Sequence, residues 1–273
     1  HKKNIFTEMP LFSKIILFTT ILLGCIFIGS IFIRQHNIQT EHTKQEINNT
    51  LLAIHDKKDA ANAKLLYDNE SDALVLLQEA KKYDPEKVLV ACDIDQTLMM
   101  STREFGGNPW FVHMVQQKMA QGMSNTEAIQ LTLPEYFYAQ FRINMQTVEP
   151  CTAQVIRQLK QDGYNVICLT ARSAELLYRT HIQLEGIGID SNNDNFKKYC
   201  FFNDLVWPCL YLNGILGVKD NHKGEALFRF LDINKTQFEA VIFIDDQEKY
   251  LKQVEGSAAK RDVEFVGLRY SKC

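Results

Sequence analysis

Several features that would narrow the function of this chain are missing from its 273 residues. Positive charge is not in excess, because 30 lysines and arginines stand against 33 aspartates and glutamates, a formal net charge of −3 at pH 7. A basic surface for nucleic acid is therefore not expected. Neither of the glycine-rich phosphate loops, G-x-x-x-x-G-K-[ST] and G-x-G-x-x-G, is present, which argues against P-loop and dinucleotide chemistry. No internal repeat is evident, and the length leaves room for one α/β domain with an insertion or a tail.

Charge is also missing from a run of 19 residues, Ile15 to Ile33. About 20 such residues span a bilayer as a helix, so the run predicts a transmembrane helix within an N-terminal anchor, residues 1–34. The sequence around Cys25, LLGC, also resembles a bacterial lipoprotein box. Cleavage of the segment as a signal, or a lipid on Cys25, is therefore the alternative to a permanent anchor.

Basic residues on the two sides of this run give a weak orientation. Three lysines precede the run, and the nearest basic residues after it are Arg34 and Lys44. The slight bias places the N-terminus in the cytoplasm and the large domain in the periplasm or otherwise outside the cytoplasm, as a single-pass membrane protein. A secreted effector is the alternative location.

The chain after the run divides into a polar stalk and a folded domain. Residues 35–70 are polar and predict the stalk, and residues 71–273 predict the domain, with a first helix between Ser71 and Tyr83. Six cysteines lie outside the run, an even number that an oxidising compartment could pair. Cys92 and Cys168, however, fall in predicted core strands, where an inert buried thiol is favoured.

The strongest functional signal is the stretch from Lys87 to Met99, KVLVACDIDQTLM. Its continuous apolar run is typical of a strand buried on both faces, as in a parallel sheet between two layers of helices. Asp93 and Asp95 follow at the carboxyl end of the strand, the edge at which open α/β sheets bind ligands. Side chains two residues apart on an extended segment point the same way. Two like charges this close together are costly unless a bound cation or a shared proton relieves them. The structural alternative is that they only end a strand or cap the next helix.

Three later stretches strengthen this signal. Tyr164 to Arg172, YNVICLTAR, is a second apolar strand and ends in Thr170. Val218 to Leu227, VKDNHKGEAL, places a lysine at the start of a helix, and Ala240 to Gln247, AVIFIDDQ, is an apolar strand that ends in two aspartates. Each feature is common when it stands alone. The complete order DxD, Thr, Lys, DD is hard to obtain by chance.

This order resembles the four motifs of the haloacid dehalogenase (HAD) superfamily, whose phosphohydrolases use an aspartate nucleophile. The resemblance covers roughly Leu74 to Tyr270 and is specific at the motifs. Within the superfamily the chain is similar to small HAD-like phosphatases of intracellular bacteria. The resemblance implies an α/β fold, a Rossmann-like parallel sheet between helices, with a helical cap inserted after the first strand.

The resemblance also implies roles for the aspartates. Asp93 would be the nucleophile and a metal ligand, and the backbone carbonyl of Asp95 and the side chain of Asp246 would complete the protein's share of the coordination. Asp245 would bind the metal through water or take the direct role itself, and both remain open. Mg²⁺ is the expected ion, because it is hard and prefers oxygen ligands. Asp95 would protonate the leaving group and later activate water, which favours a phosphatase over the ATPases and dehalogenases of the superfamily.

Two further residues are implied as contacts of the phosphoryl group. Thr170 would donate to its oxygens, and Lys223 would neutralise charge on the phosphate and on Asp93. Lys219 competes for the lysine role, but Lys223 is preferred because Lys-Gly-x-x-Leu opens a helix, as in the superfamily. Arg172 is either a substrate contact or a surface residue at a helix start, and the second reading is slightly favoured.

The long stretch between the first two motifs predicts the cap, at about residues 99–148. Phe111 to Met119 and Thr126 to Met145 have helical patterning. Trp110 and Tyr136 supply aromatic surface that would line a lid over the substrate. The alternative is that these aromatic residues form the core of the cap itself.

The rest of the chain predicts the remaining layers of the sheet. A helix after Val148 returns to the strand that ends in Thr170. Cys209 to Val218 predicts a hairpin around Asn213-Gly214, a good turn pair. Val263 to Leu268 would close the sheet.

The expected activity is hydrolysis of a phosphomonoester through an aspartyl-phosphate. A phosphotyrosine protein, a nucleotide and a small metabolite are all compatible substrates, so a protein-tyrosine phosphatase is one form that the enzyme would take. A receiver domain also uses acids, Thr and Lys around Mg²⁺, but its motif order differs. A membrane-anchored module that has kept the fold without turnover is the remaining alternative.

Overall fold

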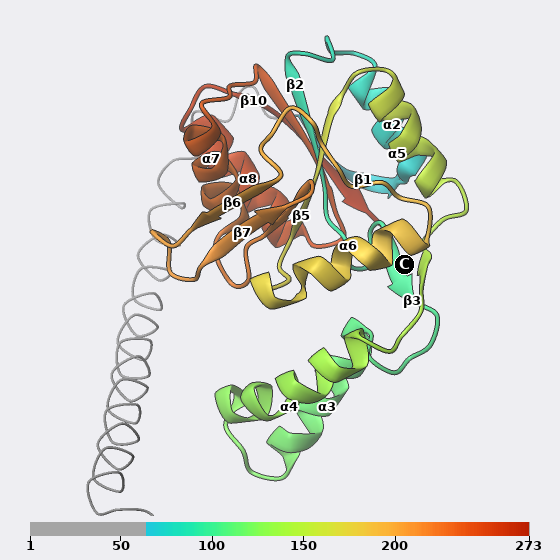
Figure 1. Cartoon of the computed structure of the whole chain (residues 1–273), viewed down its shortest axis with the longest axis vertical. Helices are drawn as coiled ribbons and strands as arrows, with labels where there is room; N and C mark the ends of the chain where they lie inside the picture. The colour runs from blue at the N-terminus through green and yellow to red at the C-terminus, as the bar shows by residue number, and fades with distance from the viewer. Residues whose placement is uncertain (1–63, 273) are drawn as a thin grey trace, which may run out of the picture. The chain divides into compact units, whose positions relative to one another are not determined.

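The chain divides into two units, His1–Asp59 and Ala60–Cys273, and the computed structural model describes residues 64–272 (Figure 1). The transmembrane prediction for Ile15–Ile33, the lipoprotein alternative at Cys25 and the predicted stalk up to residue 63 lie outside these residues. Within residues 64–272, no helix combines the length and the apolar character needed to cross a membrane.

The described unit is built on one sheet of eight strands. Six neighbouring strands run parallel, and the last two continue the sheet antiparallel. This confirms the predicted α/β class with a mainly parallel central sheet. In spatial order the strands are β1 (Lys64–Ser71), β10 (Glu264–Tyr270), β9 (Ala240–Asp245), β2 (Val88–Cys92), β5 (Asn165–Thr170), β8 (Ile215–Gly217), β7 (Cys209–Leu212) and β6 (Tyr199–Phe202).

Helices cover both faces of the sheet (Figure 1), and the burial of β2 shows why the apolar runs are continuous. Val88 and Val90 belong to the core cluster that also contains residues of α2, α5 and α6, whereas Leu89 and Ala91 belong to the cluster that contains residues of α7 and α8. All four are fully buried, since a strand between two helical layers has no solvent face. The helices are α2 (Ala73–Ala80), α5 (Thr152–Gln161), α6 (Leu177–Gly186), α7 (Lys223–Asn234) and α8 (Glu248–Ala259).

A separate helical insertion, residues 99–148, leaves the sheet through a two-stranded antiparallel ribbon. The ribbon pairs β3 (Met99–Ser101) with β4 (Met145–Thr147), and between them lie α3 (Asn108–Ala120) and α4 (Asn125–Gln140). Ser124 starts α4 with a capping box, in which it and Glu127 bind each other's backbone N–H. The helical pattern predicted as far as Met145 is too long, because α4 ends at Gln140 and Met145 is already in β4.

Two other boundaries also differ from the predictions. The predicted stalk, residues 35–70, extends too far, because Lys64–Ser71 form strand β1 and pair in parallel with β10. As a result β10 does not close the sheet: it lies between β1 and β9. The sequence does not reveal this strand, because its apolar residues Leu65, Leu66 and Tyr67 form only a short run. An edge strand is stabilised by backbone hydrogen bonds to one neighbour and needs no longer run.

The predicted hairpin joins β7 to β8 through Asn213 and Gly214, which have φ angles of 48° and 84°. Both residues being in the left-handed region is typical of the tightest hairpin turns. The cysteines are unpaired where the structure describes them, at Cys92, Cys151, Cys168, Cys200 and Cys209.

Candidate functional site

The first pair of aspartates lies at the carboxyl edge of the sheet, directly after β2. The backbone N–H of Asp93 donates to the carbonyl of Ile244 at 2.9 Å, which keeps Asp93 beside the end of β9. The chain then turns sharply, because the N–H groups of Leu98 and Met99 both donate to the carbonyl of Ile94 at 3.0 Å. Asp93 is 6% exposed, whereas the neighbouring Asp95 is only half-buried.

The lysine of the site comes from the first residue of α7. His222 caps this helix, with its Nδ1 accepting from the N–H of Glu225 at 3.2 Å. A Cβ on Gly224 would lie 2.2 Å from the carbonyl oxygen of Gln253, so only glycine lets α7 approach α8 this closely. Lys223 is thereby fully buried at the edge of the sheet.

The ammonium group of Lys223 binds two carboxylates at once. Its Nζ lies 2.6 Å from Oδ1 of Asp93 and 2.7 Å from Oδ2 of Asp245, and 4.2 Å from the ring centre of Tyr250. The competing Lys219 instead places its Nζ 3.6 Å from the ring centre of Trp207. Of the two candidate lysines, Lys223 is therefore the one that contacts the carboxylates.

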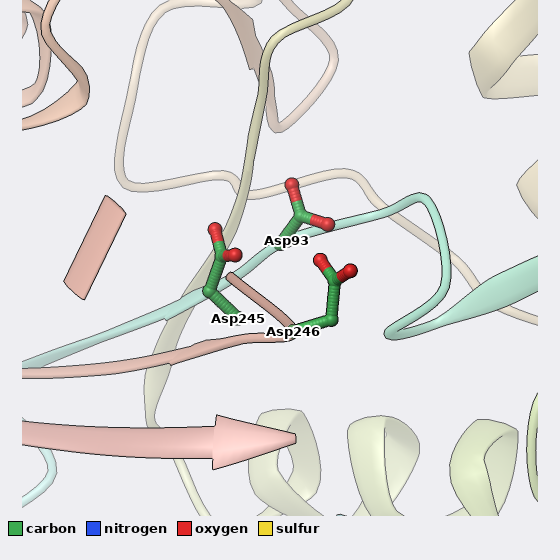
Figure 2. A group of neighbouring side chains, drawn as sticks. All are labelled: Asp93, Asp245 and Asp246. Atoms are coloured by element: carbon green, nitrogen blue, oxygen red, sulfur yellow. The ribbon is translucent and has the colours of Figure 1, made fainter. Parts of the chain in front are cut away.

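Three carboxylates gather where β2 and β9 end (Figure 2). One oxygen each from Asp93, Asp245 and Asp246 lie within 4.8 Å of one another, a spacing that can hold a metal ion. Both oxygens of Asp245 have partners, because Oδ1 accepts from the N–H of Gln247 at 2.7 Å and Oδ2 accepts from Lys223. Asp246 is half-buried and its side chain is directed toward Asp93 (Figure 2).

The crowding of these acids changes their proton affinities. Burial raises the pKa of Asp93 to about 7, with Lys223 opposing the rise and the charges of Asp245 and Asp95 adding to it. Burial and the charge of Asp93 raise the pKa of Asp246 to about 6. Burial also raises the pKa of Asp245, against the effect of Lys223. Burial alone would lower the pKa of Lys223, but the two carboxylates outweigh it and the pKa is raised, so the ammonium stays charged.

A second ion pair holds Asp95. Arg172 donates from Nε to Oδ2 at 2.8 Å and from the NH2 nitrogen to Oδ1 at 2.7 Å, a bidentate pair. Arg172 is 5% exposed, so the expectation of a surface residue at a helix start is wrong. Burial lowers the pKa of Arg172, but the charge of Asp95 outweighs it and the pKa is raised. No sequence pattern indicated this, because the partner, Asp95, lies 77 residues earlier in the chain, in the turn after β2.

The threonine of the second motif ends β5 next to this pair. Thr170 is 1% exposed, and its Oγ1 accepts from the backbone N–H of Arg172 at 3.1 Å. Its hydroxyl proton thus remains to be donated elsewhere. Another hydroxyl, Oγ1 of Thr97 in the turn after Asp95, is buried and has no hydrogen-bond partner within residues 64–272.

Residues 70–273 match the family described as "Protein of unknown function (DUF2608)". The chain belongs to this family. The match begins at residue 70, near the end of β1, and continues to the end of the chain, so it takes in the other seven strands of the sheet, the helical insertion and all four motifs.

Relatives of this DUF2608 chain occur in Chlamydia. A "Putative outer membrane protein" of Chlamydia trachomatis serovar D is 23% identical over 189 residues, which cover 69% of this chain and 71% of the relative. A protein of similar name in Chlamydia pneumoniae is 24% identical over 188 residues, with the same two coverages.

Solved structures that resemble the chain include a haloacid dehalogenase-like hydrolase from Streptococcus pneumoniae. It is 12% identical, with 67% of this chain and 95% of that chain covered and a TM-score of 0.44. A class C acid phosphatase from Bacillus anthracis is 11% identical, with 73% of each chain covered and a TM-score of 0.38.

The two aromatic residues predicted for the cap have different surroundings. Tyr136 packs edge-on against Phe111 with ring centres 5.2 Å apart. Burial raises its pKa to about 12, the charge of Asp95 adds to the rise and Arg172 opposes it, so its hydroxyl lies within electrostatic reach of that ion pair. Trp110 packs edge-on against Phe105 and helps to line a cavity of about 410 Å³ with Pro134, Glu135 and Tyr138.

The donor set of the site fits a divalent cation. Four carboxylates, those of Asp93, Asp95, Asp245 and Asp246, stand against the two cations Lys223 and Arg172. The pKa values of Asp93 and Asp246 are raised first by burial and then by the neighbouring negative charges, so keeping these carboxylates ionised has a cost. A cation with oxygen ligands would remove that cost and keep the carboxylates ionised.

Proposed function

We propose that this chain is a Mg²⁺-dependent phosphohydrolase that removes phosphate from a phosphomonoester through an aspartyl-phosphate on Asp93. The observation that carries the proposal is the division of the two motif aspartates between different cations. The buried carboxylate of Asp93 forms an ion pair with Lys223, and the carboxylate of Asp95, two residues later, forms one with Arg172. Such a division gives two identical side chains different tasks at one edge of the sheet.

In the first step an oxygen of Asp93 attacks phosphorus and the bond from phosphorus to the ester oxygen breaks. Lys223 orients the attacking carboxylate through Oδ1. The hydroxyl of Thr170 donates to a phosphoryl oxygen, and protonated Asp95 gives its proton to the leaving oxygen, so that an alcohol departs.

In the second step water attacks the same phosphorus. Asp95, now ionised, takes a proton from the water, and the bond between Asp93 and phosphorus breaks. Inorganic phosphate and the free Asp93 carboxylate result. The positive charge of Lys223 stabilises the departing carboxylate in this step.

Asp93, Asp246 and the backbone carbonyl of Asp95 would hold the metal ion, which when bound supplies positive charge to the phosphoryl oxygens. The hydrogen bonds favour Asp246 over Asp245 as the direct ligand, because both oxygens of Asp245 already accept hydrogen bonds. Asp245 would then act by holding Lys223 in place.

The helical insertion, residues 99–148, would act as the cap that selects the substrate, with Tyr136 within electrostatic reach of Asp95. The chlamydial relatives are named as outer membrane proteins, which supports a place in the cell envelope. From the uncharged run at residues 15–33 and the lysines before it, we propose that the phosphatase is anchored through this run and lies outside the cytoplasm. Release as a secreted effector is the alternative.

Substitution of the nucleophile tests the activity. Asp93→Asn should reduce the hydrolysis of 4-nitrophenyl phosphate at least about 10³-fold, because the amide keeps the size but cannot attack phosphorus. Removal of Mg²⁺ from the unsubstituted chain should have a comparable effect. Asp220→Asn is the matched control, since Asp220 is exposed and lies near the start of α7.

Two results would contradict the proposal. Undiminished hydrolysis by Asp93→Asn would remove Asp93 as nucleophile. An unsubstituted chain that cleaves none of a panel of aryl, nucleotide, sugar and phosphotyrosine esters with Mg²⁺ present would favour the binding module without turnover.

A further inference from the structure

The guanidinium that holds Asp95 is itself held by α6. The NH1 nitrogen of Arg172 donates to Oε1 of Gln183 at 2.7 Å and to Oγ1 of Thr180 at 3.0 Å. Nε, NH1 and NH2 of Arg172 are therefore all engaged, two of them by Asp95 and one by α6. The position of Asp95 therefore depends on α6.

Gln183 continues the hydrogen bonds into the helical insertion. Its Nε2 donates to the side-chain Oε1 of Gln140 at 3.2 Å and to the backbone carbonyl of Gln140 at 3.1 Å. Gln140 is the last residue of α4, and its Nε2 donates to the carbonyl of Gly106 at 2.7 Å. Gly106 lies before α3, so this contact ties the two ends of the helical pair together.

The hydrogen bonds from Arg172 through Gln183 and Gln140 to Gly106 form a series, in which each residue donates to the next. Arg172 can only donate, which turns the oxygen of Gln183 toward it and leaves the amide NH₂ of Gln183 for Gln140. The same reasoning turns the oxygen of Gln140 toward Gln183 and its NH₂ toward Gly106. A flipped amide at either glutamine would place two donors or two acceptors together.

The three linking side chains are buried, with 5% exposure for Arg172, 4% for Gln183 and 1% for Gln140. A buried amide that loses its partner costs about 1–3 kcal/mol, so breaking one contact of the series destabilises the arrangement of its neighbours. None of the proposed chemical steps requires a glutamine at position 140 or 183. Their contacts instead join Asp95 to the helical insertion.

We propose that Gln183 and Gln140 are positioning residues that tie the orientation of Asp95, through Arg172, to the helical insertion. This inference rests on the proposed function for the role of Asp95. When the insertion lies as in the structure, the series holds the Asp95 carboxylate in one orientation. When the insertion moves, Gln140 carries Gln183 and then Arg172 with it, and Asp95 loses that orientation.

The kinetic test uses Gln183→Met and Gln140→Met, which keep the approximate size and remove the side-chain hydrogen bonds. Phenyl phosphate and 4-nitrophenyl phosphate differ little in shape, but only the first needs a well-placed acid for its leaving group. Because kcat/KM reports the first chemical step, we expect it to fall about 10-fold or more for phenyl phosphate and less than about 3-fold for 4-nitrophenyl phosphate.

Arg179→Met is the matched control. Arg179 lies on α6, as Gln183 does, and donates to the carbonyls of Gln140 at 2.9 Å and Ile143 at 3.2 Å. These two hydrogen bonds do not involve Arg172. Its loss removes two hydrogen bonds to the insertion but leaves the series to Asp95 intact. We expect kcat/KM to change by a similar factor for both esters. A leaving-group effect as large as in Gln183→Met would show that attachment of the insertion alone matters, and would overturn the proposal.

A second measurement needs no turnover. Trp207→Phe leaves Trp110, in α3, as the single tryptophan. In this background Asp95→Asn should change the acrylamide quenching of Trp110 at least about 1.5-fold, because the substitution alters the pair with Arg172. The same Asp95→Asn should have no effect once Gln183→Met is also present.

The outcomes separate the two proposals. If the unsubstituted chain cleaves neither ester, the proposed function fails, and the Trp110 quenching alone decides whether the series couples Asp95 to the insertion. If the chain cleaves both esters but Gln183→Met lowers both kcat/KM values equally, the positioning role is wrong. Quenching that does not respond to Asp95→Asn would also overturn it.

Discussion

Asp93 and Asp95 have the same side chain, two positions apart, and different surroundings. The side chain of Asp93 is 8% exposed and shares Lys223 with Asp245, whereas that of Asp95 is 28% exposed and binds Arg172 through both oxygens. Because the carboxylate of Asp93 is buried, it is accessible to a group bound in the site and largely shielded from bulk water. Partial exposure lets the second exchange a proton with a leaving group or with water. The roles proposed for the two residues follow from this contrast.

Loss of Asp95 should trap the intermediate. In Asp95→Asn, 4-nitrophenyl phosphate should still phosphorylate Asp93, because its leaving group needs little protonation, while hydrolysis of the aspartyl-phosphate loses its base. Mass spectrometry after a rapid acid quench should find one phosphoryl group on Asp93. We also expect a lower melting temperature, because Arg172 is buried and loses its charged partner.

Three comparisons control this trapping experiment. The adduct should be absent from the unsubstituted chain at steady state, from Asp93→Asn and from Asp95→Asn without Mg²⁺. An adduct on another residue, or full turnover by Asp95→Asn, would contradict the assignment of Asp95.

The raised pKa of Asp93 makes stability depend on pH. With a folded-state pKa of about 7 against an ordinary value of 3.8, the folded chain binds more protons than the unfolded chain between these values. Its free energy of unfolding therefore falls as the pH rises through that window, by at most about 4 kcal/mol from this group.

Asp93→Asn isolates this contribution, because the amide does not titrate. In metal-free buffer, urea unfolding at pH 4 to 8 should show the unsubstituted chain losing stability relative to Asp93→Asn as the pH rises. Added Mg²⁺ should stabilise the unsubstituted chain more at pH 8 than at pH 5. A difference between the two chains that does not change with pH would contradict the buried, poorly neutralised state of Asp93.

A tight turn at the amino end of β8 holds this strand against β5, whose carboxyl end carries Thr170. The hairpin of Asn213 and Gly214 joins β7 to β8, and the carbonyl of Gly214 accepts from the N–H of Cys168 in β5, the strand that ends in Thr170. Gly214 has a φ of 84°, and a Cβ there would lie 1.6 Å from the carbonyl oxygen of Ser191. Both the backbone conformation and the close approach therefore require glycine.

Gly214→Ala should lower the free energy of unfolding by more than about 2 kcal/mol, because a left-handed alanine already costs about 1–2 kcal/mol and the clash forces the backbone to move. Gly163→Ala is the matched control. Gly163 has a φ of 89°, and a Cβ there would meet only Cβ of Pro85, at 3.7 Å. Urea unfolding should show clearly the larger loss in Gly214→Ala. Equal losses would mean that the contact with Ser191 relaxes without cost.

At the scale of the whole molecule, the location of the folded domain remains a prediction from the sequence. Residues 15–33 carry no charge, and lysines precede them. Protease added to intact cells, or to spheroplasts if an outer membrane is present, should digest residues 64–272 and spare a cytoplasmic marker protein. Complete protection of the domain in spheroplasts would contradict this orientation. Appearance of the domain in the medium would favour a secreted effector.

The sequence by itself determined the α/β class and the order of the four motifs. Apolar runs that end in Asp93, Thr170 and Asp245 predict buried parallel strands, since a strand between two helical layers needs no polar face. The same local rules gave the hairpin at Asn213-Gly214 and the helix that starts at Lys223. They failed at β1, because an edge strand needs no apolar run, and at the end of α4.

Only the tertiary structure decided which groups meet. The spatial order β9, β2, β5 brings the ends of three strands together, but the sequence does not record the order of strands. The contact of Lys223 with both Asp93 and Asp245 follows from that order. The hydrogen bonds to both oxygens of Asp245 and the buried ion pair of Arg172 with Asp95 follow from it too. So does the series from Asp95 to Gln140, whose residues come from four separate segments. Hydrogen bonds between distant segments depend on distances of a few tenths of an ångström, and those are fixed by packing and leave no periodic pattern in the chain.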